Sequence, residues 1–123
     1  MDKNIPEEIL KLNPEVMIVL GHGGYVSPED IYEGKDMGMN WKVLQSVNAI
    51  KNRRVGSLGT TEWRATIECP IGLLREAKTL YPDKFKDINP NAEEIKLYKN
   101  IYGLNDEEVK EAVKAQRYYG NPH

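Results

Sequence analysis

Short apolar runs alternate along the chain with polar breaks rich in glycine and proline, and one stretch near the start organises the rest. Residues 6–12 place apolar side chains on one side of a short helix, which ends before Pro14 because a residue preceding proline disfavours the helical conformation. Val16–Leu20 is then an unbroken apolar run, typical of a parallel strand covered by helices on both faces. Gly21–Tyr25 follows at the carboxyl end of this strand, where open α/β sheets bind ligands.

The remaining pattern predicts one more strand and several helices. Ser27-Pro28 and Asn105 with Glu108 are typical helix starts, the second resembling a capping box. The expected helices are 28–33, 41–46, 69–80, a single turn at 82–85, 90–102 and 106–118, and the second strand is 54–58 after a turn at 47–53. The loop 59–66 ends the second strand as residues 21–25 end the first, so the two loops are expected to form one surface.

This order of elements predicts an α/β fold, a Rossmann-like three-layer lobe with a short, mostly parallel sheet flanked by helices. Residues 1–117 are expected to form one partial domain, and residues 118–123 a flexible tail. Two strands are a poor core for an independent α/β domain. We therefore expect the sheet to be completed by a strand from elsewhere or by a second copy of the chain.

Composition reduces the classes of function that the chain can have. Seventeen basic and nineteen acidic residues give a net charge of −2, so no basic footprint indicates a nucleic-acid partner. No apolar stretch reaches the length of a membrane span, and no export signal is visible. The single cysteine, Cys69, excludes an internal disulfide and is interpreted as structural.

The glycines after the first strand do not match a nucleotide-binding fingerprint. Gly21, Gly23 and Gly24 lack the spacing of a dinucleotide site, and no P-loop lysine follows them. No nucleophile–base pair and no Cys/His cluster with zinc spacing is visible either. These absences disfavour a small enzyme or nucleotide-binding domain, and no resident cofactor or metal is expected.

The chain resembles the C-terminal lobe of the substrate-binding proteins of ABC importers for iron–siderophore, haem and cobalamin, the clamshell class with two lobes joined by a long helix. Four stretches between about Pro6 and Gly103 carry this resemblance: 6–16 with the apolar strand after it, 41–55, the loop around Glu62-Trp63 leading to Pro70, and 73–85. The resemblance implies a metal-chelate ligand, an importer permease as partner and an extracytoplasmic location. The N-terminal lobe, the linking helix and the first strand of the class do not appear before Met1, so we expect a truncated lobe.

The resemblance also assigns roles to individual residues. Glu7, with Glu8 as the alternative, matches the carboxylate that docks on an arginine pocket of the permease, although an acid at a helix start also serves the helix dipole alone. Glu62, Trp63 and Arg64 lie where the class contacts its ligand, and a tryptophan face and a guanidinium suit a macrocycle or a chelate carboxylate. The alternative for Trp63 is a lid over the local core.

His22 and Tyr25 are expected to reach the same cleft, where imidazole and phenol groups suit haem iron or a ferric centre. A lone histidine in a glycine loop is more often a bystander, so no metal site is assigned to it. Two other functions stay open: a structural α/β module that self-associates through an unpaired sheet edge, and a small nucleotide-binding or enzymatic α/β domain.

Overall fold

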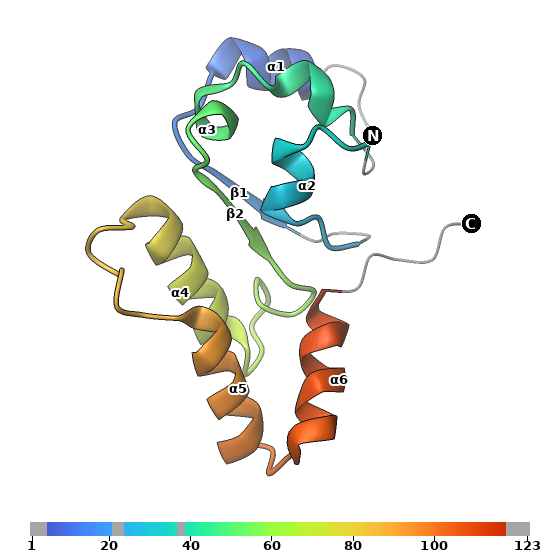
Figure 1. Ribbon diagram of the computed structural model, residues 1–123, viewed down its shortest axis with the longest axis vertical. Helices are drawn as coiled ribbons and strands as arrows, with labels where there is room; N and C mark the ends of the chain where they lie inside the picture. The colour runs from blue at the N-terminus through green and yellow to red at the C-terminus, as the bar shows by residue number, and fades with distance from the viewer. Residues whose placement is uncertain (1–4, 21–23, 37–38, 118–123) are drawn as a thin grey trace.

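Two parallel strands lie at the centre of the computed structural model, which describes residues 5–20, 24–36 and 39–117. β1 (Met17–Leu20) pairs with β2 (Val55–Leu58) in a register that runs from Met17 opposite Val55 to Leu20 opposite Leu58. Because the strands are parallel and in register, their last residues, Leu20 and Leu58, lie at the same end of the sheet (Figure 1).

Four short helices surround one end and one face of this sheet. They are α1 (Ile5–Leu12), α2 (Pro28–Tyr32), the 3-10 helix η1 (Trp41–Leu44) and α3 (Asn48–Lys51) (Figure 1). Their apolar side chains and that of Val55 form the apolar core, whose buried members are Ile31, Trp41, Leu44, Val47, Ala49, Ile50 and Val55. This core fixes α2 and β2 against each other.

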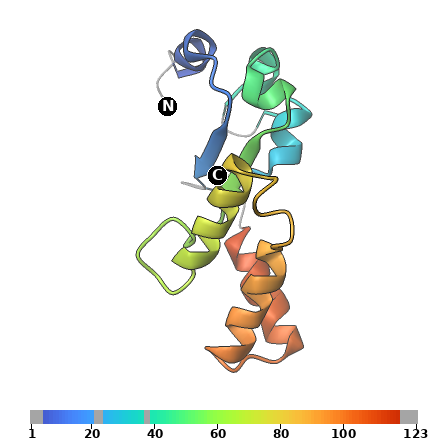
Figure 2. The same ribbon diagram turned by 90° about the vertical axis from the view of Figure 1, so that its left-hand side faces the viewer.

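The opposite face of β2 is covered by α4 (Cys69–Leu80), and the chain then continues into α5 (Pro90–Asn100) and α6 (Asp106–Gln116). Both views show α5 and α6 side by side beyond the end of the sheet (Figures 1 and 2). Gly56 permits the close approach of α4, because a Cβ there would lie 2.3 Å from Thr79 Oγ1. The chain is thus a small α/β protein in which helices cover both faces of β2.

The predicted helix starts are confirmed. Ser27 Oγ accepts from the backbone N–H of Asp30, and Asn89 Oδ1 accepts from the first turn of α5. Asn105 and Glu108 form the complete capping box, each side chain accepting from the other's backbone N–H. The long helix predicted over residues 69–80 is found with the same bounds.

The predictions for three short segments are corrected. The segment 47–53, expected as a turn, contains the one-turn helix α3, and the helix expected over 41–46 is the shorter 3-10 helix η1. The turn at 82–85 has single hydrogen bonds from the N–H groups of Lys84 and Phe85 to the carbonyl of Tyr81 but does not form a helix. Each of these segments is too short to carry a helical repeat.

The prediction that the first strand is buried on both faces is wrong. Residues 17–19 are half-buried and Leu20 is 47% exposed, whereas all four residues of β2 are buried. The reason is that α2 and α4 both pack on β2, and no described strand pairs with the outer edge of β1. In the described residues, none of the helices combines the length and the apolar character that crossing a bilayer requires.

Candidate functional site

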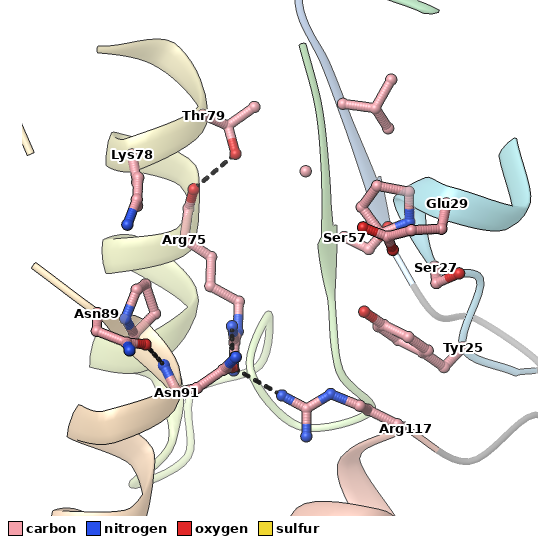
Figure 3. Close-up of a pocket in the computed structure, with 14 residues that line it drawn as sticks. Tyr25, Ser27, Glu29, Ser57, Arg75, Lys78, Thr79, Asn89, Asn91 and Arg117 are labelled. Atoms are coloured by element: carbon pink, nitrogen blue, oxygen red, sulfur yellow. Dashed lines mark hydrogen bonds between the residues drawn. The ribbon is translucent and has the colours of Figure 1, made fainter. Parts of the chain in front are cut away.

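A polar pocket of about 570 Å³ opens over the outer edge of β2, the edge that does not pair with β1 (Figure 3). We call it the β2-edge pocket. Its walls are the start of α2 with the segment before it, the inner face of α4 and the start of α5, with Arg117 at one end. The lining residues are Tyr25, Ser27, Pro28, Glu29, Val55, Gly56, Ser57, Arg75, Lys78, Thr79, Asn89, Pro90, Asn91 and Arg117. Its volume is within the usual range of small-molecule sites.

The backbone of β2 forms the floor of this pocket. In a parallel ladder the N–H and C=O groups of alternate residues point to opposite edges. Met17 donates to the carbonyl of Arg54, so the backbone groups of Val55 and Ser57 point away from β1. Val55 is satisfied there by the Tyr32 hydroxyl, which accepts from its N–H at 3.1 Å and donates to its carbonyl at 3.4 Å.

Further along the same edge, the N–H of Gly59 donates to Glu62 Oε2 at 2.9 Å. Ser57 lies between these two capped positions. It is only 7% exposed, and no described group bonds its side-chain Oγ. A buried hydroxyl without a partner costs free energy, so the edge has one polar position left open at Ser57.

Arg75 of α4 forms the cationic wall. Its Nε donates to both oxygens of Glu62, at 2.9 and 3.1 Å, and its Nη2 lies 3.3 Å from Glu94 Oε2. The two carboxylates are 2% and 0% exposed, so this guanidinium joins two buried acids. We call Glu62, Arg75 and Glu94 the buried ionic cluster.

Asn91, in the first turn of α5, connects two guanidinium groups. Its Oδ1 accepts from Arg75 Nη1 and from Arg117 Nη2, each at 2.9 Å (Figure 3). Arg117 Nη1 also lies 3.7 Å from Glu94 Oε1. These contacts orient both arginines at the end of the pocket and leave the amide Nδ2 of Asn91 as a donor.

The two buried acids differ in protonation. Burial, the hydrogen bond to Glu62 and the negative charge of Glu62 raise the pKa of Glu94 to about 7. Burial also opposes ionisation of Glu62, but the hydrogen bonds from Glu94 and from the N–H of Gly59, together with Arg75, outweigh it and lower the pKa of Glu62. Below about pH 7 the pair therefore holds a proton, and that proton resides on Glu94.

Side chains of α5 and α6 attach the loop after β2 to the body of the protein. Gln116 Oε1 accepts from the N–H of Thr61, and its Nε2 donates to the hydroxyls of Thr61 and Tyr98. The N–H of Thr60 donates to the carbonyl of Gln116. The loop is therefore held by specific hydrogen bonds rather than by apolar packing.

The residues predicted as ligand contacts lie in three different settings. Tyr25 lines the β2-edge pocket, while Glu62 is inside the buried ionic cluster, where a ligand reaches it only by displacing Arg75. Arg64 is exposed and stacks over the half-buried Trp63 ring at 4.8 Å, which gives a flat cationic surface on the loop. His22 lies outside the described residues.

Glu7 and Glu8, predicted to dock on a permease, lie in the first turn of α1 and are both exposed. They are at the other end of the molecule from α5 and α6 (Figure 1). Their carboxylates are thus accessible to a partner, and neither has an ion-pair partner among the described residues.

Sequence reasoning did not single out the residues that line the pocket walls, namely Ser57, Arg75, Lys78, Asn91 and Arg117. One signal was available. Ile71, Arg75 and Thr79 are spaced i, i+4, i+8, so a charged residue falls on the stripe of α4 that faces the core. A cation at such a position requires a buried acid as partner, but the sequence did not indicate which acid.

Comparison with protein-family models, with curated proteins and with solved structures found no match for this chain. The described residues also contain no group of three or more His, Cys, Asp or Glu side chains able to hold a metal ion. The described lining of the pocket offers hydrogen-bonding groups and charged side chains. Among the described residues, no base is bonded to the Ser57 hydroxyl.

Proposed function

We propose that this protein is a ligand-binding lobe of a two-part substrate-binding protein, serving an ABC importer for a metal chelate such as an iron–siderophore, haem or cobalamin. The observation that carries the proposal is the parallel, in-register pairing of β1 with β2. It brings the last residues of both strands, Leu20 and Leu58, to one end of the sheet, the carboxyl end at which α/β lobes bind ligands. The sequence resemblance supplies the chelate and the importer.

In this proposal the loop after β2 presents the chelate surface. Trp63 offers an aromatic face and Arg64 a cation stacked on it, a combination suited to a flat or carboxylate-bearing chelate. Tyr25, and by the sequence resemblance His22, come from the loop after β1. Glu62 has a positioning role, because its carboxylate fixes the start of the loop at Gly59 and pairs with Arg75.

The open outer edge of β1 supports a partner half. The backbone groups of Ile18 point to that edge, no described strand pairs with it, and Leu20 is 47% exposed. A lobe that works opposite a second lobe closes its cleft only when both are present. We therefore expect the chain alone to bind chelates weakly.

The binding test is a fluorescence titration of the chain with cobalamin, haemin and a ferric hydroxamate chelate. We expect saturable quenching by one of them, with a Kd weaker than about 10 μM. Trp63→Phe weakens binding further. The matched control is Trp41→Phe, since Trp41 is buried in the apolar core. Absence of saturation with all three chelates, or equal binding by both variants and the parent, contradicts the proposal.

The docking role is tested separately in cells that depend on the protein for chelate uptake. Glu7→Lys and Glu8→Lys are expected to reduce uptake while the chelate Kd stays unchanged, because both residues lie on α1, away from the loop after β2. A matched control is Glu107→Lys, an exposed acid in the first turn of α6. Equal uptake by all three variants removes the docking role.

The same open edge favours a second candidate function, a structural module that self-associates through β1. Four apolar residues with an unpaired edge are a template for another strand. Sedimentation at several concentrations tests it, and Ile18→Pro, which removes the outward N–H, should abolish any dimer. A monomer at every concentration excludes this candidate.

A further inference from the structure

The β2-edge pocket has polar groups whose charge or hydrogen-bonding capacity the described residues use only in part. Lys78 is the first of them. Its Nζ donates to the carbonyl of Ile88 at 2.8 Å, and no described carboxylate lies within ion-pair distance of it. Lys78 therefore brings a positive charge to the pocket wall that the described residues leave unneutralised (Figure 3).

Ser57 is the second group. Its hydroxyl is buried without a described partner, and its backbone N–H and C=O point to the same outer edge of β2. The position offers two donors, the N–H and the hydroxyl, and two acceptor oxygens, the C=O and Oγ, within one residue. Asn91 adds its amide Nδ2, because both arginines occupy its Oδ1.

The charges of the lining residues indicate the charge of the ligand. The lining contains three cations, Arg75, Lys78 and Arg117, and one acid, the exposed Glu29. Arg75 is paired with the buried Glu62 and also contacts the buried Glu94, whose pKa is raised to about 7. The pocket is therefore rich in donors and positive charge, which suits an oxyanion such as a carboxylate.

The same edge excludes an extended peptide. An added strand pairs with alternate residues of β2, which means Val55, Ser57 and Gly59. Tyr32 already bonds both backbone groups of Val55, and Glu62 bonds the N–H of Gly59. Only Ser57 is left for a ligand, so the occupant is a small molecule rather than a strand.

We propose that the β2-edge pocket binds a small hydroxycarboxylate. Its carboxylate accepts hydrogen bonds from Lys78 and Asn91, and its hydroxyl donates to Ser57 Oγ, the buried atom without a described partner. This site goes beyond the chelate-binding role, because all its contacts lie within this chain and none comes from Trp63 or Arg64.

The test is isothermal titration of the full chain with citrate, with tricarballylate, which is citrate without its hydroxyl, and with inorganic phosphate, at constant ionic strength. We expect citrate to bind with a Kd of about 1 mM or tighter. Tricarballylate is expected to bind about threefold to tenfold more weakly, since it cannot form the hydroxyl hydrogen bond. Phosphate, which engages only the cationic wall, is expected to be weaker still.

Two variants locate the site. Lys78→Gln keeps a donor for Ile88 but removes the charge, and should weaken citrate binding about tenfold or more. Ser57→Ala should weaken it about threefold to tenfold, yet raise the Tm of the ligand-free protein, because it deletes a buried hydroxyl without a partner. Lys86→Gln, an exposed lysine outside the pocket, is the matched control and should change neither.

Three results overturn the proposal. The first is no saturable citrate binding up to about 10 mM, and the second is citrate binding that is the same in the parent and in both variants. The third is equal Kd values for the three probes, which would indicate a site for any anion.

Trp63→Phe separates this site from the chelate surface. It should leave the citrate Kd unchanged even if it abolishes chelate binding, so the two proposals fail independently.

Discussion

The two halves of this protein are held together by different forces. On the α2 face of β2, seven buried apolar residues form the core. On the other side, around α4, α5 and α6, buried apolar residues such as Ile71 and Val109 are accompanied by three buried polar or charged side chains, those of Glu62, Glu94 and Gln116. We call these the apolar half and the polar half.

The difference concerns how each half tolerates change. An apolar core is stabilised by any well-packed apolar side chain of suitable volume. The buried ionic cluster depends on one cation between two acids. Removal of a single partner leaves an unpaired charge in the protein interior, where the dielectric constant is low. The polar half is therefore the more specific of the two and the easier to disrupt with one substitution.

The largest effect is expected from Arg75→Met. It removes the guanidinium that joins Glu62 to Glu94, and breaking a buried ion pair costs about 3–5 kcal/mol of unfolding free energy. Urea denaturation measures the loss. Arg64→Met is the control, because that exposed side chain has only the stack on Trp63. A loss equal to that of the control would mean that the cluster adds nothing to stability.

A slightly smaller effect is expected in the apolar half. Leu44→Ala opens a cavity at a fully buried position of η1 and should cost about 2–5 kcal/mol. Leu12→Ala removes the same atoms at a position that is 77% exposed and should cost less than about 0.5 kcal/mol. Equal losses at the two positions would argue against the apolar core described above.

The third effect is a pH dependence that belongs to the polar half. The pKa of Glu94 is about 7 in the folded protein against a usual 4.5, so between these values the folded state binds more protons than the unfolded state. The contribution of Glu94 to stability is therefore complete below about pH 4.5 and is lost as the pH rises through 7. We expect a change of about 1–3 kcal/mol across this window.

Glu94→Gln tests this assignment, because the amide keeps a donor toward Glu62 without titrating. The variant should show a flatter stability profile between about pH 5 and 8. Glu62 acts in the opposite direction, since its lowered pKa means that its stabilisation is lost in acid. If the variant keeps the slope of the parent, another group is responsible.

The smallest effect is expected at the helix caps, one in each half. Asn105→Ala removes the capping box of α6 and Ser27→Ala the cap of α2, and each should cost about 1 kcal/mol. Thermal unfolding of both variants checks this. Equal losses of stability would show that capping contributes the same in both halves. A loss for Asn105→Ala alone would mean that only the cap of the longer helix contributes to stability.

Local signals predicted much of the fold. The bounds of α4 and the capping box of α6 follow from proline, asparagine and apolar spacing within one helix. The burial of β1 was predicted wrongly, because burial depends on which strand the helices cover, and that is a tertiary property. The helix α3 has four residues, too few to show a period.

The candidate site was predicted less completely. Tyr25 and Glu62 were identified from their positions after strands, and Tyr25 lines the pocket. The partners Arg75, Asn91 and Arg117 come from three separate segments, and no spacing rule connects them. Buried polar contacts between distant segments leave no periodic trace in a sequence, so their partners became visible only in three dimensions.

Gly72 shows how much depends on a residue with no side chain. A Cβ at this position would lie 2.0 Å from the carbonyl oxygen of Glu62, so any other amino acid forces α4 away from the loop after β2. Arg75 follows less than one turn later on the same helix and would move with it. A methyl group at Gly72 would thus separate the guanidinium from its acids without altering a single charge. A Gly72→Ala variant would therefore lose the stability contributed by these ion pairs for a purely steric reason.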